Sequence, residues 1–445
     1  MEISVIIPLW NGATVASACL DAVKRYSNPE RTQIICVDNA STDESAALIQ
    51  REHPDVRLLP QPVNLGFAGG VNAGMSIAQG ELLVLLNQDC IVTPGWLDSL
   101  ASTIAANPAC GIAGAVIEDE SGAINHAGAT ITHPLGYGQH IQQIPAHDTR
   151  VDYVTGAIFA IHRSVWERIG GMDEDFYPAY YEESDYCHRA RRHGIETYLS
   201  VGARGRHLFS SRAWQRDPIR HTANQHQSRY RFICKQFDDR ALMDFVQAEA
   251  DAASNEPSFH EALGRVLAAS HTLQHLGEIL QRRHADGNDA LPPAFRRVLA
   301  VGFAAIYQAA LRRSMQLALP QPGDGAPASD FVTWQAQSAE AHQRIREIHA
   351  RIANQWRVID SAYTSIAGHG IGADPQPSLR NKLKQAYHIA TGQHIGLLVN
   401  IVHQLVQQQE LLQTLEHRMN LLETELTLQE YQRHLLEQLV IYAHR

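Results

Sequence analysis

Residues 81–90 read ELLVLLNQDC, and this stretch decides which fold the first half of the chain adopts. Its apolar run is short and is bounded by turn-forming residues, which favours a β-strand that is buried on both faces. The strand would deliver Asn87 and Asp89 to its carboxyl end, with both side chains on the same side. Three more runs of this kind come earlier in the chain: Ser4–Pro8, Gln33–Asp38 and Val56–Pro60.

Segments with a helical pattern alternate with these runs. Ser41 stands three residues before Glu44, and this spacing predicts a capping box at the start of the second helix. The alternation of strands and helices predicts an α/β fold with a mostly parallel, Rossmann-like sheet and helices on both of its faces. The expected helices lie near Ala13–Tyr26, Thr42–Glu52, Gly69–Ala78 and Pro94–Ala106.

The length and composition of the chain limit the number of domains and the kinds of partner that can be expected. A chain of 445 residues exceeds one ordinary domain, so at least two are expected. The net charge of −10 argues against a nucleic-acid partner. The six cysteines form no CxxC pair and are expected to be buried thiols in a reducing compartment. We expect no signal peptide and no transmembrane segment, and therefore a cytoplasmic protein.

The second half of the chain has a helical composition. After about Phe237 the strand patterns stop, and Ala, Gln, Leu, Glu, His and Arg dominate to the end. We expect three regions: an α/β domain over 1–237, an all-α domain over 238–378 and a long helix over 379–445. The helices expected inside the second region are Ser258–Arg283, Pro293–Leu319 and Ser329–Ile366.

The last region carries a heptad pattern. Mostly apolar residues recur there at alternating steps of four and three, from Ile401 through Leu405, Leu412 and Leu422 to Val440. This pattern predicts a coiled coil that forms a homo-oligomer or binds a partner. The alternative is a long helix that packs on the other helices of its own domain.

Three features at the expected strand ends suit a nucleotide ligand, because ligands bind at the carboxyl ends of strands in open parallel sheets. Asp38 suits a hydrogen bond to a base or ribose, or simply forms a turn. The glycines of NLGFAGGVNAG (64–74) allow a close backbone approach to phosphates. Asp89 suits a Mg²⁺ or Mn²⁺ ion that bridges a diphosphate, although Asn87 and Asp89 also suit a turn.

A further stretch, GGMDEDFYPAYYEESDYCHRARRHG (170–194), predicts a helix that begins near Glu182 or Glu183 and stops at Gly194. Acidic residues at a helix start complement the helix dipole, which would explain any one of them. A carboxylate there should also keep a low pKa and stay ionised, as a general base requires. The preceding Tyr180 and Tyr181 could form a wall on which a sugar ring stacks.

Taken together, these segments resemble the inverting glycosyltransferases of family 2, which have the GT-A fold, and most closely the rhamnosyltransferase-like bacterial members. The resemblance covers about Ile3–Ser211. The stretches that carry it are SVIIPLWNG, VDNASTDES, NLGFAGGVNAG, LLNQDC, VTGAIFAIHRSVWERIGGMDEDFYPAYYEESDYCHRARRHG and RGRHLFS.

The resemblance implies a role for each matching residue. Glu183 would be the catalytic base, with Glu182 as the alternative, and Asp89 and His207 would hold Mg²⁺ or Mn²⁺. The acceptor would contact Tyr180, Tyr181 and Gly156. The implied donor-binding residues are Pro8, Asp38, Asn64, Gly66, Asn72, Asn87 and Asp89. Two positions depart from the family pattern, because Asn87 replaces the first acid of the DxD motif and Glu183 replaces the usual second Asp of the ED motif.

The implied function is transfer of a sugar, with inversion, from a nucleotide-diphosphate donor to a hydroxyl of a glycan or lipid-linked glycan. Such an enzyme would serve cell-surface polysaccharide synthesis in the cytoplasm or, as a peripheral protein, at the inner membrane face. Asn87 favours the alternative of a catalytically degenerate scaffold that acts through its helical half. A nucleotidyltransferase should carry a basic loop after the first strand, and PLWNGATVAS (8–17) has no Lys or Arg.

Four histidines recur every seven residues, at His126, His133, His140 and His147. A helix would align them, but prolines and glycines between them forbid one. We expect an acceptor-side loop or hairpin here, with no meaning in the spacing.

Overall fold

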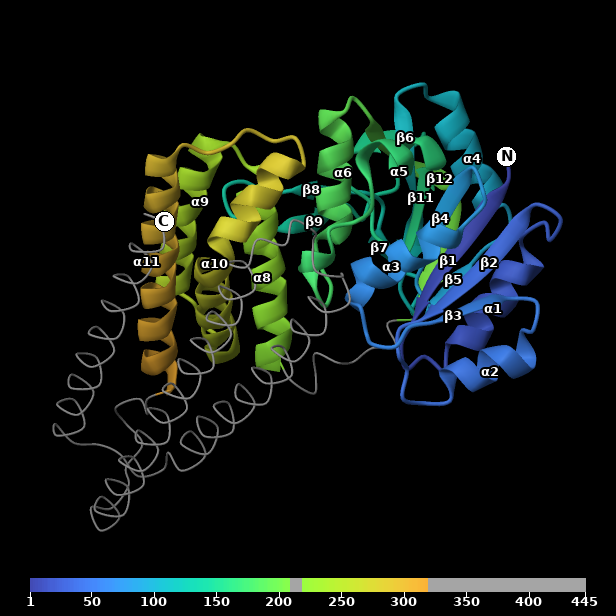
Figure 1. Cartoon of the computed structure of the whole chain (residues 1–445), viewed down its shortest axis with the longest axis horizontal. Coiled ribbons are helices and arrows are strands. Elements are labelled where there is room, and N and C mark those ends of the chain that lie inside the picture. Colours follow the sequence, from blue (N-terminus) through green and yellow to red (C-terminus); the bar gives the residue numbers. More distant parts are fainter. Residues whose placement is uncertain (209–217, 319–445) are drawn as a thin grey trace, which may run out of the picture. The chain divides into compact units, whose positions relative to one another are not determined.

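The computed structural model describes residues 1–208 and 218–318, and within it Met1–Ser314 form one compact unit (Figure 1). The expected border at residue 237 falls inside this unit. The helix expected at Ser329–Ile366 and the long helix expected over 379–445, with its proposed oligomer contact, lie outside the described residues. The strands are β1 Ile3–Leu9, β2 Thr32–Asp38, β3 Arg57–Pro60, β4 Leu82–Leu86, β5 Cys90–Val92, β6 Cys110–Glu118, β7 Ile124–His126, β8 Ala129–Ile131, β9 Gly138–His140, β10 Thr149–Val151, β11 Ile158–His162 and β12 Glu196–His207.

The helices alternate with the strands in the first part of the chain and follow one another in the last part. They are α1 Ala16–Arg25, α2 Ser45–Glu52, α3 Gly66–Ile77, α4 Trp96–Ala106, α5 Arg163–Ile169, the 3₁₀ helix η1 Glu174–Phe176, α6 Glu182–Arg192, α8 Pro218–Gln236, α9 Asp239–Ser254, α10 Phe259–Ala285 and α11 Pro293–Ala318. The four strands and four helices that the sequence predicts before residue 107 are all present, and α10 and α11 match two of the expected C-terminal helices.

The main sheet is mixed, with the order β10-β12-β6-β11-β4-β1-β2-β3. The strands β3, β2, β1 and β4 run parallel to one another, as the strand–helix alternation predicts. Strand β11 lies antiparallel between β4 and β6, and β10 is antiparallel to β12. The expectation of a mostly parallel sheet therefore holds for the β3–β4 half, whereas the other half, which had no clear strand signal, combines the parallel pair β6–β12 with antiparallel pairs.

Helices cover both faces of this sheet (Figure 1). On one face, apolar residues of α1, α2 and α4 form a single buried cluster with β1 and β4. On the other face, α3 packs closely on β1, where Gly74 lies against Ile6, and α6 contacts β11 through Tyr186 and Phe159. Every residue of Leu82–Leu86 is fully buried, which confirms the two-sided burial expected for this strand. The edge strand β3 is half-exposed, so that expectation is wrong for it.

The predicted capping box before α2 is wrong. The residue at the cap position of this helix is Glu44, whose side chain makes no capping hydrogen bond. The Ser41 hydroxyl instead accepts a hydrogen bond from the backbone N–H of Asn11 at 3.0 Å. A bond across to the loop after β1 therefore replaces the local one that the spacing suggested.

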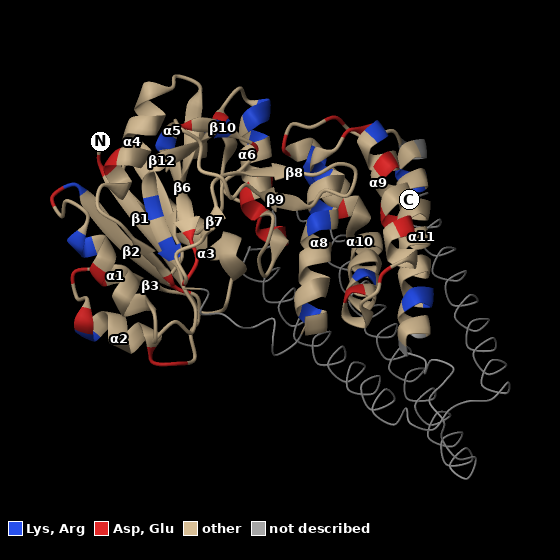
Figure 2. Ribbon diagram, turned by 180° about the vertical axis from the view of Figure 1, so that it is seen from behind, with Lys and Arg blue, Asp and Glu red and all other residues tan. Residues whose placement is uncertain are grey.

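Helix α6 has the boundaries and charge pattern expected from the sequence. It begins at Glu182 and ends before Gly194, which has a φ of +73°. Figure 2 shows acidic residues at its start and basic residues at its end, the arrangement that complements the helix dipole.

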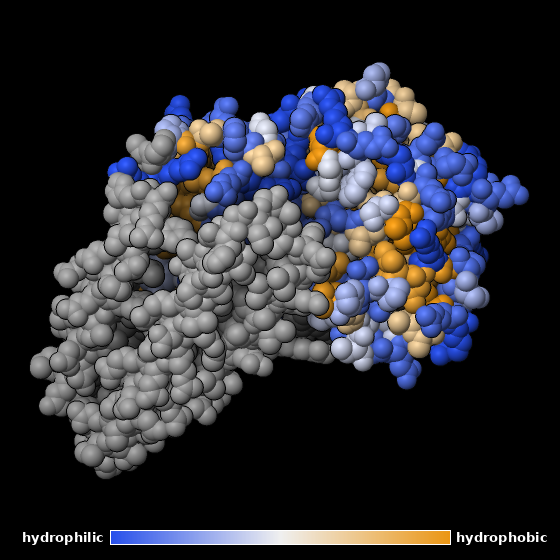
Figure 3. All heavy atoms as spheres, in the orientation of Figure 1, coloured by the Kyte–Doolittle hydropathy of each residue, from blue (hydrophilic) through white to orange (hydrophobic). Residues whose placement is uncertain are grey.

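Three general features concern the described residues as a whole. All six cysteines are buried and form no disulfide, as expected. Among the described helices, none is long and apolar enough to cross a membrane. On the face shown in Figure 3, apolar residues lie at several places among hydrophilic ones in the part that is not grey.

Candidate active site

Hydrogen bonds tie together the loops that follow β1, β2 and β4. The backbone N–H of Trp10 donates to Gln88 Oε1 at 2.9 Å, and Gln88 Nε2 donates back to the Trp10 carbonyl at 3.1 Å. Asn11 Oδ1 accepts from the backbone N–H of Thr42 at 2.8 Å, and Asn11 has a positive φ of 48°. The carboxyl ends of these three strands therefore form one edge, where a ligand site is expected in such a sheet.

Asp38 lies at this edge, at the end of β2, and is only 6% exposed. Its carboxylate accepts a hydrogen bond from the backbone N–H of Ser41 at 3.0 Å. The turn-forming role that the sequence left open is therefore present. Contact of Asp38 with a nucleoside stays a prediction.

Asp89 and His207 are brought together although they are 118 residues apart in the chain. His207 Nε2 lies 2.9 Å from Asp89 Oδ1, and Asn87 Nδ2 lies 3.4 Å from the same imidazole nitrogen. The pairing of β12 with β5 explains the contact, because it sets His207 opposite Cys90 in the antiparallel register. A carboxylate oxygen and an imidazole nitrogen are suitable ligands for a divalent ion such as Mn²⁺. The residues therefore fit the metal site that the sequence predicts.

The loop before α3 is shaped by an asparagine that the sequence did not single out. Asn39 accepts from the Leu65 N–H at 2.9 Å and donates to the Gly66 carbonyl at 2.8 Å. Asn64 Oδ1 accepts from the Gly66 N–H at 2.8 Å. Gly66 has a φ of +75°, and a Cβ atom there would lie 2.8 Å from the Tyr177 ring, so the site needs a glycine.

Two more of the predicted donor-binding residues, Asn72 and Pro8, make contacts within the protein. Asn72 donates to the Met172 carbonyl at 2.9 Å and accepts from its N–H at 2.9 Å, which joins α3 to the segment before η1. Pro8 lies beside α3, where a Cβ on Gly70 would be 3.6 Å from it. Their proposed contacts with the donor stay predictions.

The two tyrosines ahead of α6 have an unusual backbone. Tyr180 and Tyr181 have φ values of 87° and 68°, a region that non-glycine residues seldom adopt. The Tyr181 hydroxyl donates to the Gly136 carbonyl at 2.9 Å, and the Tyr180 hydroxyl lies 3.1 Å from His221 Nδ1 on α8. Backbone strain of this kind persists only where the surroundings fix it, and it clusters at functional sites.

Glu183 is the predicted base, and Gly156 is a predicted contact of the acceptor. The two residues are in direct contact. Glu183 Oε1 accepts from the Gly156 N–H at 2.8 Å, and a Cβ on Gly156 would lie 2.8 Å from that oxygen. The next residue, Ala157, accepts at its carbonyl from the Asn87 N–H at 3.1 Å. Residues 156–157 thus connect Glu183 to the strand end that carries Asn87 and Asp89.

The expected low pKa at the start of α6 is wrong for both glutamates. Burial raises the pKa of Glu182 well above its usual value, and the neighbouring Glu183 charge raises it further. Burial also raises the pKa of Glu183, and the hydrogen bond from Gly156 offsets only part of the effect. Desolvation of a buried carboxyl therefore outweighs the helix dipole here.

The two glutamates differ in their surroundings. Glu182 is 3% exposed, and its Oε2 atom has no hydrogen-bond partner among the described residues. Glu183 is less buried and is oriented by Gly156. This difference favours Glu183 as the group that meets a substrate.

Sequence reasoning missed Trp10, which is 52% exposed and follows β1 at the ligand-binding edge. An exposed aromatic side chain in the motif PLWNG was the available signal. It also missed Lys235, whose isolated position in α8 gave no signal. Its three carboxylate partners are distant in sequence.

His133 and His140 lie in the β8–β9 hairpin, and His126, on β7, meets one of them. His126 and His140 have ring centroids 4.6 Å apart, and burial lowers the pKa of His126 to about 3. His133 instead stacks on Phe237, with the ring centroids 4.6 Å apart. The contact between His126 and His140 follows from the backbone hydrogen bond between Ala127 and Ile141, and the seven-residue spacing does not explain it.

A profile of the family described as Glycosyl transferase family 2 matches residues 4–170, the segment that contains the β1, β2 and β4 strand ends. This part of the chain is therefore similar to family 2 glycosyltransferase domains. The match and the observed α/β sheet confirm the GT-A domain that the sequence predicts.

Curated relatives of the glycosyltransferase domain include enzymes of glycan synthesis. N-acetylglucosaminyl-diphospho-decaprenol L-rhamnosyltransferase of Mycobacterium tuberculosis is 26% identical over 232 residues, which cover 45% of this chain and 74% of that protein. Low-salt glycan biosynthesis hexosyltransferase Agl10 of Haloferax volcanii is 27% identical over 173 residues, which cover 37% of this chain and 54% of that protein.

Solved structures similar to this chain are more distant. GalNAc-T7 with UDP, GalNAc and Mn²⁺ gives a TM-score of 0.48 at 16% identity, over 64% of this chain and 54% of that chain. The mannosyltransferase PcManGT from Pyrobaculum calidifontis, in complex with GDP-Man and Mn²⁺, gives a TM-score of 0.42 at 20% identity, over 70% of this chain and 86% of that chain. Neither likeness supports a comparison of individual residues.

Proposed function

We propose that this protein is an inverting glycosyltransferase that moves a sugar from a nucleotide-diphosphate donor to a hydroxyl of a glycan or lipid-linked glycan. The observation that supports this most is the link through residues 156–157. The Gly156 N–H binds Glu183, and the Ala157 carbonyl binds the N–H of Asn87, two residues before Asp89. The backbone of residues 156–157 therefore links the carboxylate that we propose as the base to the strand end that carries the carboxylate that we propose as the metal ligand.

In this proposal Glu183 removes the proton from the acceptor hydroxyl. Its raised pKa makes it a stronger base than an exposed glutamate, and a base works best when its pKa is near the working pH. The hydroxyl oxygen then bonds to the anomeric carbon while the bond from that carbon to the diphosphate oxygen breaks. The electron pair of the broken bond leaves with the diphosphate, and attack from the opposite face inverts the anomeric configuration.

The donor would lie along the carboxyl edge of β1, β2 and β4. Asp89 and His207 would hold a Mg²⁺ or Mn²⁺ ion, which neutralises charge on the leaving diphosphate when bound. Trp10 would stack on the base, because it is the exposed aromatic residue at this edge, and Asp38 would bind the base or ribose. Pro8, Asn64, Gly66, Asn72 and Asn87 would shape or contact the remainder of the donor site.

The acceptor would approach Gly156, Tyr180 and Tyr181. The name of the mycobacterial relative specifies a sugar acceptor on a lipid diphosphate, and we extend this acceptor class to the present chain as part of the proposal. The reaction would take place in the cytoplasm, with the protein at the inner membrane face.

The proposal is tested in two steps. UDP-, dTDP- and GDP-sugars are first screened with Mn²⁺ or Mg²⁺ by thermal shift. The donor that binds is then incubated with polyprenyl-diphosphate-linked N-acetylglucosamine, and the product is analysed by mass and by the anomeric coupling in its proton NMR spectrum. The proposal predicts one added sugar with inverted configuration. If the protein binds no donor in this screen, the result would instead support the alternative of a catalytically degenerate scaffold, which the replacement of an acid by Asn87 favours.

A further inference from the structure

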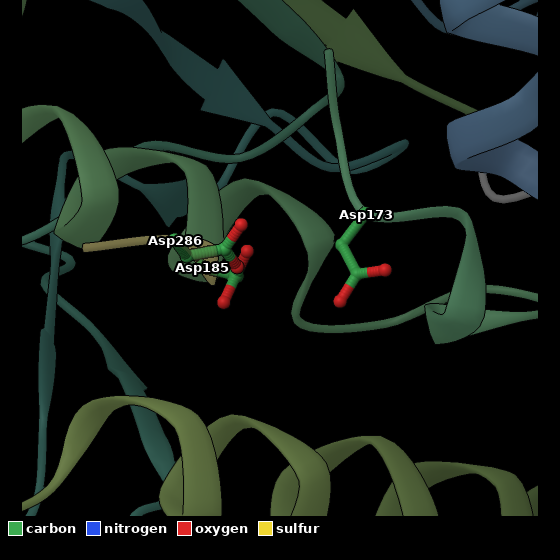
Figure 4. A group of neighbouring side chains, drawn as sticks. All are labelled: Asp173, Asp185 and Asp286. Atoms are coloured by element: carbon green, nitrogen blue, oxygen red, sulfur yellow. The ribbon is translucent and has the colours of Figure 1, made fainter. Parts of the chain in front are cut away.

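Helix α8 buries a lysine ammonium among three carboxylates from separate parts of the chain. Lys235 Nζ lies 2.8 Å from an oxygen of each of Asp173, Asp185 and Asp286, and the lysine is fully buried. Figure 4 shows these carboxylates on the segment before η1, on α6 and on the segment after α10. Their oxygens lie within 4.8 Å of one another, a spacing that would suit a metal ion. The ammonium of Lys235 supplies the positive charge there.

Ion pairs extend from these carboxylates to further basic side chains. Arg231, one turn earlier on α8, lies 2.8 Å from Asp173 Oδ2 and 2.9 Å from Asp175 Oδ2. Arg189 pairs with Asp185, and Arg282 pairs with Asp286. Ion pairs therefore join four basic side chains to four acidic ones: Lys235, Arg231, Arg189 and Arg282, and Asp173, Asp175, Asp185 and Asp286.

Burial alone would raise the pKa of Asp185, but the charges of Lys235 and Arg189 outweigh it and lower that pKa. The Asp185 carboxylate is therefore ionised and buried. Loss of one partner from such a group is costly, because it leaves an uncompensated charge inside the protein.

The Lys235 contacts hold the part of the chain that carries the proposed base. Asp185 lies in the first turn of α6, two residues after Glu183, and Asp173 begins the segment that leads to Tyr180 and Tyr181. No side chain caps the start of α6, and the two tyrosines before it have positive φ values. The start of α6 therefore lacks a side-chain cap, and Lys235 and Gln236 of α8 bind its first turn through Asp185.

We propose that Lys235 is a positioning residue for sugar transfer, whose ammonium holds the first turn of α6, and with it Glu183, in the orientation the reaction needs. The proposal rests on the function proposed above. It extends the catalytic unit to α8, which lies beyond the residues 4–170 matched by the family profile.

The test compares three lysine variants of the full chain. Lys235→Met removes the charge and keeps most of the stem, Lys235→Arg keeps the charge, and Lys24→Met removes a surface ion pair on α1 as the control. Donor affinity and the number of donor sites per chain are measured by calorimetry, and kcat is measured at saturating donor and acceptor. For Lys235→Met we expect unchanged donor sites, donor Kd within about twofold, and kcat lower by about 10–100-fold, because a misplaced catalytic group can cost about 10²-fold.

The other two variants separate positioning from general damage. Lys235→Arg should regain most of the lost kcat, and Lys24→Met should match the wild type. A Lys235→Met protein with full donor binding and wild-type kcat would overturn the proposal.

A second variant covers the case in which Lys235→Met does not fold. Gln236→Leu removes the hydrogen bond from Gln236 Nε2 to Asp185 Oδ1, which is 2.6 Å long, together with the one that Gln236 accepts from Arg192, and leaves Lys235 and its ion pairs in place. It should lower kcat by several-fold with donor binding unchanged, and wild-type kcat would overturn the proposal. A wild-type protein that binds no donor would instead refute the proposed function, so the two failures are distinguishable.

Discussion

His207 Nε2 lies 2.9 Å from Asp89 Oδ1 at the carboxyl edge of the sheet. If this pair holds a divalent ion, Asp89→Ala should abolish metal-dependent binding of the nucleotide diphosphate. We expect donor affinity in the presence of Mn²⁺ to fall by more than about 100-fold. Loss of a residue that only hydrogen-bonds to a metal ligand already lowers metal affinity by about 10–100-fold, and loss of the ligand itself should cost more. Asp98→Ala, at an exposed acid on α4, is the control. Unchanged donor affinity of Asp89→Ala by calorimetry would remove the metal assignment.

Trp10 is expected to contribute stacking energy to donor binding. Trp10→Ala should weaken donor affinity by about 5–150-fold, the equivalent of about 1–3 kcal/mol for one aromatic–base stack. Trp10→Phe keeps an aromatic face and should recover most of the affinity. The same loss for both variants would show that the indole acts through something other than stacking.

Gly156 is expected to be sensitive to a single methyl group. The Cβ of Gly156→Ala would lie 2.8 Å from Glu183 Oε1 and 2.9 Å from the Phe67 ring, so the glutamate must move. We expect kcat to fall by about 10²-fold, the effect of a displacement near 1 Å, with donor affinity retained. Gly277→Ala on α10, where a Cβ meets no atom within 4 Å, is the matched control. A fully active Gly156→Ala protein would contradict the role of this contact.

Glu182 is expected to destabilise the protein at neutral and basic pH. Burial and the Glu183 charge raise the pKa of Glu182 in the folded protein above its value in the unfolded chain. At pH values below the unfolded-state pKa, the protonated Glu182 therefore contributes to the stability of the folded state. That contribution is lost as the pH rises through the folded pKa. Glu182→Gln cannot ionise, so its Tm should exceed that of the wild type by about 2 °C or more at pH 8, with a smaller difference at pH 5.

Thermal unfolding of the two proteins at both pH values checks this prediction. Glu30→Gln, at an exposed position on the surface, should show no such dependence of its Tm difference on pH. A Glu182→Gln protein with the same Tm difference at pH 5 and pH 8 would show that the buried carboxyl is not the cause.

The sequence predicted those features that local pattern determines. The run Leu82–Leu86 is apolar at every position, which predicts a central strand and the place of Asp89 at its end. The boundaries of α6 follow from its acidic start and from Gly194. The meeting of Asp89 with His207 came from the resemblance to the family, because no local pattern links positions 118 residues apart.

Features set by tertiary contacts could not be predicted. The raised pKa of Glu183 comes from its burial in the folded chain, which the helix-dipole argument did not include. The Ser41 capping box failed because Asn11 competes for the same hydroxyl. The partners of Lys235 are spread from Asp173 to Asp286, so its role emerges only in the folded chain.

The activity of Glu183→Gln tests the central claim, that this chain transfers sugar with Glu183 as base. The substitution keeps the size of the side chain and removes the basic site. We expect donor affinity to remain near wild type and kcat to fall by about 10²–10⁴-fold, the usual effect of losing a general base. Because Glu183 must be ionised, wild-type kcat should also fall as the pH drops through its raised pKa. If Glu183→Gln keeps wild-type kcat at saturating donor and acceptor, Glu183 is not the base and the account is contradicted.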